Sequence, residues 1–125
     1  MEKKITIKTK PLVYFRQYLT IVNPLYRLSS QARDILAYLL YLDYTYRDLD
    51  EETKSRLILD YDSKVAISNE YNISLATINN TITHLRKKEY QGQYFILGKK
   101  LNTKVPILPI LNNTKNTLTF EFIIE

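Results

Sequence analysis

The chain has 125 residues, a mass of 14.8 kDa, a formal net charge of +5 and 45% hydrophobic residues. This length and composition predict one domain with a hydrophobic core. The absence of cysteine excludes a disulfide framework and a thiolate metal site, and a single histidine excludes a histidine-rich metal site within one chain. No apolar run has the length of a signal peptide or a membrane span, so we expect a soluble, cytoplasmic protein with no membrane partner and no cofactor.

The charge is unevenly distributed along the chain. Residues 1–27 carry six Lys or Arg against one acid, residues 28–62 carry four against eight, and residues 63–125 carry eight against four. A basic segment that follows an acidic one predicts one basic face, which is the electrostatic footprint of polyanion binding. A surface charge that only increases solubility is the alternative.

The first elements in chain order are a strand or basic arm and two helices. Lys3–Lys10 alternates apolar and polar residues, which is typical of a strand or an extended arm. Helical spacing predicts a helix over Leu12–Val22 that Asn23-Pro24 ends. Leu28-Ser29-Ser30 opens a second helix that runs to about Tyr44. We assign residues 1–27 to a basic arm and helix that contribute to dimerisation, and residues 28–125 to the main domain.

The rest of the chain alternates short helices and strands. We predict an acidic connection over Asp48–Lys54, a strand over Arg56–Tyr61, helices over Lys64–Tyr71 and Ser74–Lys88, and strands over Tyr94–Leu97 and Thr117–Ile124. The long segment Gly98–Asn116 joins the last two strands into a C-terminal hairpin, with which the early strand can pair. The predicted fold class is therefore α+β, mainly α.

The turn Tyr71-Asn72-Ile73-Ser74 is suited to a sharp chain reversal between two helices. Asn tolerates the positive φ that such a turn requires better than most residues. Ile73 then fills the corner between the helices, and Ser74 caps the next helix by accepting its first free amides.

The residues Ile73, Ser74, Thr77, Ile78, Ile82 and Leu85 follow a pattern similar to that of the winged helix-turn-helix superfamily, as in MarR-like and related bacterial and phage regulators. The segment from Asn23-Pro24-Leu25 to Leu39 also resembles the lead-in to the first core helix of MarR-like proteins. The resemblance covers roughly Leu12–Lys88, and it departs at Glu89, where the family usually has Gly. It implies a winged helix-turn-helix with an N-terminal helix, a C-terminal β-hairpin wing and a DNA-reading helix.

Helical geometry places Ala76, Asn80, Thr83 and Lys87 opposite Ile78, Ile82 and Leu85, with Asn79 beside them. Asn can bond to adenine, and Thr or Ala can contact the thymine methyl. The resemblance implies contacts near the helix start, and lysines in the predicted wing suit phosphates. The candidate DNA-binding residues are Ser74, Leu75, Ala76, Thr77, Asn79, Asn80, Thr83, Lys87, Lys99, Lys100 and Lys104.

We therefore expect a non-enzymatic protein that binds double-stranded DNA sequence-specifically, as a transcription regulator or a replication-associated protein. We expect a homodimer, because Leu12–Val22 and Val105–Leu111 offer more apolar surface than so short a chain buries. Two alternatives remain open. The Asn- and Thr-rich face can be a plain solvated helix face, and the chain can be an assembly protein, such as a phage virion component, that uses the same scaffold for protein contacts.

Overall fold

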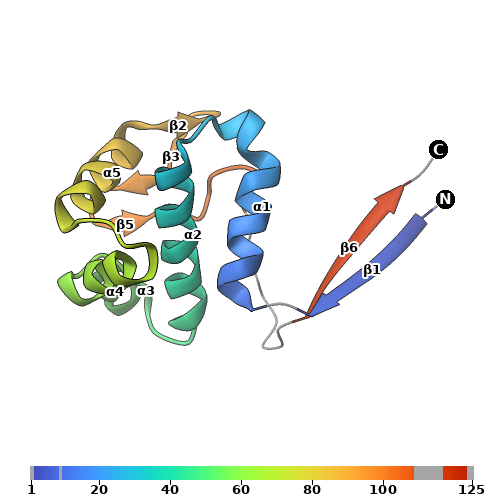
Figure 1. Cartoon of the computed structure of the whole chain (residues 1–125), viewed down its shortest axis with the longest axis horizontal. Helices are drawn as coiled ribbons and strands as arrows, with labels where there is room; N and C mark the ends of the chain where they lie inside the picture. Colours follow the sequence, from blue (N-terminus) through green and yellow to red (C-terminus); the bar gives the residue numbers. More distant parts are fainter. Residues whose placement is uncertain (1, 9, 109–116, 124–125) are drawn as a thin grey trace.

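A computed structural model describes residues 2–8, 10–108 and 117–123 of the chain, with side-chain surroundings from Lys10 to Leu108. These residues form five helices and three two-stranded antiparallel sheets (Figure 1). The helices are α1 (Pro11–Tyr26), α2 (Ser30–Thr45), α3 (Glu51–Ile58), α4 (Tyr61–Tyr71) and α5 (Leu75–Lys87). The predicted α+β, mainly α class is confirmed. None of the helices in this described part has the length and apolar character needed to cross a lipid bilayer.

Helix α1 is longer than predicted, because it continues past Pro24 to Tyr26. A proline inside a helix costs about 3 kcal/mol, and tertiary packing offsets this cost. The Tyr26 ring is buried and forms a T-shaped contact with Phe95, with the ring centroids 5.0 Å apart. Its hydroxyl donates to the Pro106 carbonyl at 2.6 Å. The helix then ends at Arg27, whose φ of 58° is left-handed.

Helix α2 forms the centre of the core, as its apolar spacing predicts. The Ser29 side chain accepts a hydrogen bond from the Ala32 amide at 3.1 Å, so the predicted cap is present. Ile35, Leu36 and Leu39 are fully buried. Helix α1 packs along α2 with Phe15, Leu19, Val22 and Tyr26 on its buried side.

The prediction of an acidic connection and a strand over Arg56–Tyr61 is wrong, because Glu51–Ile58 forms α3. The Asp50 carboxylate caps this helix by accepting from the Thr53 amide at 2.7 Å. Glu51 and Glu52 lie in the first turn, where acids interact favourably with the helix dipole. These local helix-start features outweigh the strand propensity of Leu57-Ile58-Leu59, and Ile58 is buried in the core.

Helices α4 and α5 are joined by the predicted tight turn. Asp60 caps α4, accepting from the Ser63 amide at 2.8 Å, so the helix begins at Tyr61 rather than Lys64. Asn72 ends it with φ 54° and ψ 51°, which confirms the expected left-handed residue. Ser74 caps α5 and accepts from the Thr77 amide at 3.1 Å.

Two short hairpins follow α5. They pair β2 (Glu89–Tyr90) with β3 (Gln93–Tyr94), and β4 (Ile96–Leu97) with β5 (Lys100–Leu101). Their tight turns contain Gly92, with φ 83°, and Gly98, with φ 62°, conformations that glycine adopts at little cost. Phe95 and Ile96 are buried beneath them. Buried Asn102 secures the chain that leaves β5, since its side chain donates to the Tyr94 carbonyl at 2.8 Å.

The predicted C-terminal hairpin of Tyr94–Leu97 with Thr117–Ile124 is wrong. Strand β6 (Thr117–Ile123) pairs instead with β1 (Glu2–Lys8), antiparallel, with Glu2 opposite Ile123 and Lys8 opposite Thr117. The early strand expected within Lys3–Lys10 is therefore present, but its partner is the C-terminal strand alone. Of the predicted loop Gly98–Asn116, residues 109–116 lie outside the described residues.

The two apolar stretches expected to form a dimer interface contribute to the core of the single chain. Phe15, Leu19 and Val22 of the first stretch are buried, and so are Val105 and Leu108 of the second. Val13 and Ile21 of the first stretch and Ile107 of the second remain exposed, and residues 109–111 lie outside the described residues. The expected dimer stays a prediction.

Candidate nucleic-acid interface

The inner side of α5 is anchored in the core. Ile78, Ile82 and Leu85 are each at most 2% exposed, which confirms the side predicted to face inward. A helix held by three buried residues at i, i+4 and i+7 has a fixed rotation about its axis. The opposite side of α5 therefore presents a defined set of residues to solvent.

The structure brings five of the predicted contact residues onto this exposed side, namely Ala76, Asn79, Asn80, Thr83 and Lys87. We call this set the outer face of α5. Three other predicted contacts differ in their surroundings. Leu75 is half-buried and packs against the core, Thr77 is half-buried, and the exposed Ser74 uses its hydroxyl as the helix cap.

The outer face of α5 has unused hydrogen-bonding capacity. Among the described residues, the side-chain amides of Asn79 and Asn80 have no hydrogen-bond partner. The Thr83 hydroxyl donates to the Asn79 carbonyl at 3.0 Å, which uses its proton and leaves its methyl group and oxygen lone pairs available. These amides and the methyl group are the chemical groups that match adenine and thymine edges in the major groove.

The charge along α5 is basic at one end and never acidic. No acid occurs between Leu75 and Lys88, and His84, Arg86 and Lys87 occupy the last turn. Cations at a helix C-terminus interact favourably with the helix dipole. The same cations suit contact with phosphates at the edge of a groove.

The hairpin of β4 and β5 is held against the end of α5. The Arg86 Nε donates to the Gly98 carbonyl at 2.6 Å, which fixes the β4–β5 turn beside the basic end of the helix. Lys99 is exposed at this turn. This bond therefore joins the basic last turn of α5 to the turn that carries Lys99.

The other two candidate lysines are placed differently. The Lys100 ammonium forms an ion pair with Glu51 of α3 at 3.6 Å. The Lys54 ammonium lies 2.9 Å from the same carboxylate. Hydrogen bonding and attraction from Lys54, and to a smaller extent from Lys100, hold the pKa of Glu51 below its usual value. Lys104 is exposed further along the chain, where its amide donates to the Asn102 side chain at 3.0 Å. The bond from Arg86 to Gly98 therefore holds the turn with Lys99 at the end of α5, and no such bond to α5 involves the segment around Lys104 in the described part of the chain.

A shallow groove of about 370 Å³ lies between the start of α2 and α5. It is lined by Ser29, Gln31, Ala32, Thr77, Asn80, Thr81 and His84. Gln31 is an exposed amide that sequence reasoning missed, and its place in the same groove as Asn80 depends on the packing of α2 against α5. No local sequence pattern reports that packing. The groove extends the polar surface next to the outer face of α5.

No family model matches the chain, and comparisons with curated proteins and with solved structures find no significant match. The resemblance to winged helix-turn-helix regulators stays a prediction. Within residues 2–8, 10–108 and 117–123, no cluster of three or more acidic or histidine side chains is arranged to hold a metal ion.

Proposed function

We propose that the protein binds double-stranded DNA sequence-specifically, with α4, the turn at Asn72 and α5 acting as a helix-turn-helix. The observation that carries the proposal is the outer face of α5. This face combines two unpartnered amides, a threonine methyl and a lysine on a helix whose opposite side is fully buried. Asn and Thr are poor helix formers, so a purely structural exposed face gains nothing from them.

In this arrangement α5 lies in the major groove, and Asn79 and Asn80 read base edges. Lys87 and Lys99 contact phosphates, which positions the protein without reading sequence. The β4–β5 hairpin, held to α5 through Arg86, takes the part of the wing in a winged helix. Its short Gly98-Lys99 turn replaces the long apolar wing expected from sequence.

DNA binding of this kind suits a regulator of transcription or a replication-associated DNA-binding protein. The proposal includes no catalytic step. The competing candidate is an assembly protein, such as a virion component, whose α5 packs against another protein. The test below separates the two, because an assembly protein has no reason to discriminate between duplex sequences.

Duplex selection from a random pool, followed by titration of the selected and a random duplex at several salt concentrations, tests the proposal. We expect affinity to fall with salt by about 0.9 logarithmic units per decade for each phosphate contact. Asn80→Ala should weaken binding to the selected duplex roughly 5- to 150-fold, which corresponds to about 1–3 kcal/mol, and leave the random duplex unchanged. Lys99→Ala should weaken both and lower the salt slope by about one per protomer.

Equal losses on both duplexes for Asn80→Ala would contradict base reading by α5. Binding that does not depend on salt, or no enrichment in the selection, would remove DNA as the partner. The assembly alternative would then be favoured. A purified partner that buries Asn80 and protects its surroundings from hydrogen exchange would support that alternative directly.

A further inference from the structure

The groove between the start of α2 and α5, which we call the α2–α5 groove, contains polar side chains without a partner. Hydroxyl groups in its lining are used inside the fold. The Thr81 hydroxyl donates to the Thr77 carbonyl at 2.8 Å, and the Ser29 hydroxyl accepts from the Ala32 amide at 3.1 Å. Among the described residues, the lining side chains without a hydrogen-bond partner are Gln31, Asn80 and His84.

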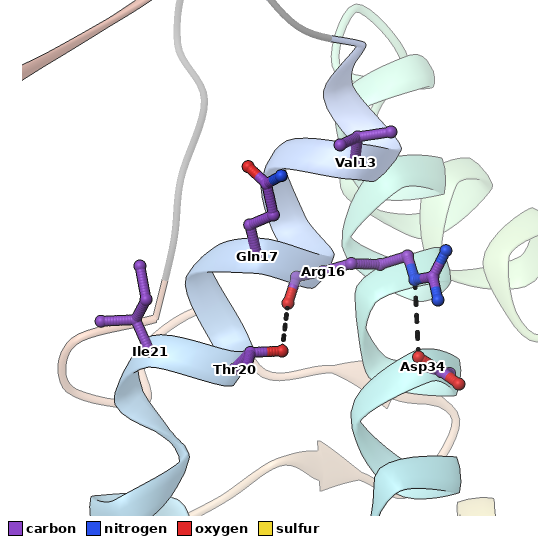
Figure 2. A pocket seen from close by; sticks show the side chains of 6 residues that line it. All are labelled: Val13, Arg16, Gln17, Thr20, Ile21 and Asp34. Atoms are coloured by element: carbon purple, nitrogen blue, oxygen red, sulfur yellow. Dashed lines mark hydrogen bonds and ion pairs between the residues drawn. The ribbon is translucent and has the colours of Figure 1, made fainter. Parts of the chain in front are cut away.

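These side chains favour an anion as the ligand of the α2–α5 groove. In the part of the chain that the structure describes, no acidic side chain lines the groove. The first acid along α2, Asp34, lines a separate hollow on α1, where its carboxylate lies 3.5 Å from Arg16 (Figure 2). The last turn of α5, which contains His84, is basic. Amide and imidazole N–H groups are donors to the phosphate oxygens of DNA.

The α2–α5 groove and the β4–β5 turn flank the outer face of α5 on opposite sides. At about 100° per residue, His84 and Arg86 point roughly 160° apart around the helix axis. All five residues of the outer face of α5 fall within this arc. His84 lines the α2–α5 groove at one limit of the arc, and Arg86 holds the β4–β5 turn at the other. A helix in the major groove has one phosphate backbone along each of its sides.

We propose that the α2–α5 groove receives a phosphodiester of the DNA strand opposite to the strand that Lys99 contacts, with the Gln31 amide and the His84 imidazole as donors. This inference rests on the proposed function and adds a second phosphate site to it. Contacts with both backbones fix the rotation of α5 within the major groove, so the same amides meet the base edges. Since Asn80 lines the same groove, the bound phosphate lies close to the base pair that Asn80 reads.

Gln31→Ala and His84→Ala test the donors. Each variant should bind the selected and the random duplex more weakly by the same factor, roughly 3- to 10-fold, because a phosphate contact carries no sequence information. Gln31→Ala should leave the salt slope unchanged, since counterion release depends on cationic contacts. His84→Gln, which keeps an N–H donor, should recover most of the affinity. Both side chains are exposed and unpartnered among the described residues, so each variant should have nearly the wild-type Tm.

Gln17→Ala is the matched control for Gln31→Ala. Gln17 is also an exposed glutamine on a helix, but it lines the separate hollow on α1 (Figure 2). This control variant should bind both duplexes with wild-type affinity.

Single phosphates of the selected duplex, replaced one at a time by an uncharged methylphosphonate, assign the strand. One replacement should weaken binding of the wild-type chain and have little further effect on Gln31→Ala, because the two changes remove the same contact. A replacement on the other strand should show the same coupling with Lys99→Ala. The phosphate coupled to Gln31 should lie within about three base steps, at roughly 3.4 Å each along a strand, of the adenine at which 7-deaza-adenine cancels the effect of Asn80→Ala.

Wild-type affinity of both Gln31→Ala and His84→Ala, with a persistent loss for Asn80→Ala on the selected duplex, would overturn this inference and leave base reading by α5 intact. Coupling of Gln31 and Lys99 to phosphates on one and the same strand would overturn it as well. An Asn80→Ala variant that binds the selected duplex like the wild-type chain would instead contradict the proposed function itself.

Discussion

Replacing both Asn79 and Asn80 by Ala should stabilise the fold while it weakens DNA binding. Both residues lie in the interior of the 13-residue α5, are exposed, and have side-chain amides without a hydrogen-bond partner among the described residues. The double substitution therefore removes no side-chain hydrogen bond from the folded state. Ala exceeds Asn in helix propensity by about 0.5–0.7 kcal/mol at each position, so the gain is about 1 kcal/mol in the free energy of unfolding.

For a chain of this size, a change of 1 kcal/mol raises Tm by about 4 °C. The loss in DNA affinity has the opposite sign and a larger magnitude, because each amide that bonds to a base contributes about 1–3 kcal/mol of discrimination. Thermal unfolding followed by circular dichroism gives the first quantity. Fluorescence anisotropy with the selected duplex gives the second.

Asn69→Ala is the control, since Asn69 is an exposed helical asparagine on α4 rather than α5. It should raise Tm by a similar amount per residue and leave DNA affinity unchanged. A double α5 variant that loses stability would show that the amides have a structural role. A variant that gains stability and keeps full affinity would show that α5 does not read bases by these residues.

Three further predictions concern the stability of the helical part of the chain. Asn72→Val should lower Tm by about 4–8 °C, because a β-branched residue in the left-handed region costs about 1–2 kcal/mol. The control variant Asn69→Val, within α4, should have almost the wild-type Tm. Equal changes in Tm for the two variants would contradict the strain argument. Ile78→Ala should lower the free energy of unfolding, measured in urea, by about 2–5 kcal/mol, since Ile78 is fully buried and its truncation leaves a cavity. A loss below about 1 kcal/mol would mean that Ile78 does not anchor α5 in the core. The Thr53 amide and hydroxyl hold the pKa of the Asp50 cap below 3.8. Because the folded-state pKa of Asp50 is depressed, the stabilisation by its carboxylate is present above pH 4 and is lost as the pH falls through that pKa. The difference in Tm between the wild-type chain and Asp50→Ala should therefore narrow from pH 6 to pH 2. A difference in Tm that is constant with pH would refute this account.

Helices with strong local signals could be predicted from the sequence. Helix α2 begins after Ser29, the apolar side of α5 is the one its spacing indicates, and Asn72 adopts a left-handed conformation. In each case the information lies within a few residues, in caps, helical periodicity and turn chemistry. The exposed face of α5 follows from the same periodicity, so Ala76, Asn79, Asn80, Thr83 and Lys87 were found together.

The errors arise where distant contacts or competing local preferences decide. Pro24 was expected to end α1, but burial of Tyr26 against the second half of the chain keeps the helix intact. The stretch Leu57-Ile58-Leu59 has the composition of a strand, and the cap at Asp50 makes it part of a helical segment instead. The placement of Lys99 depends on the bond between Arg86 and Gly98, which no pattern in the chain announces.

The amino-acid sequence by itself determined the mainly helical class, the tight turn between α4 and α5 and the polar outer side of α5, because caps and periodicity act over a few residues. Only the tertiary structure decided that β6 pairs with β1, that a short β4–β5 hairpin is bonded to the end of α5, and that Gln31 lines the same groove as Asn80. Strand pairing and helix packing join residues far apart in the chain. Their free energy depends on which surfaces remain to be buried after the local elements have formed.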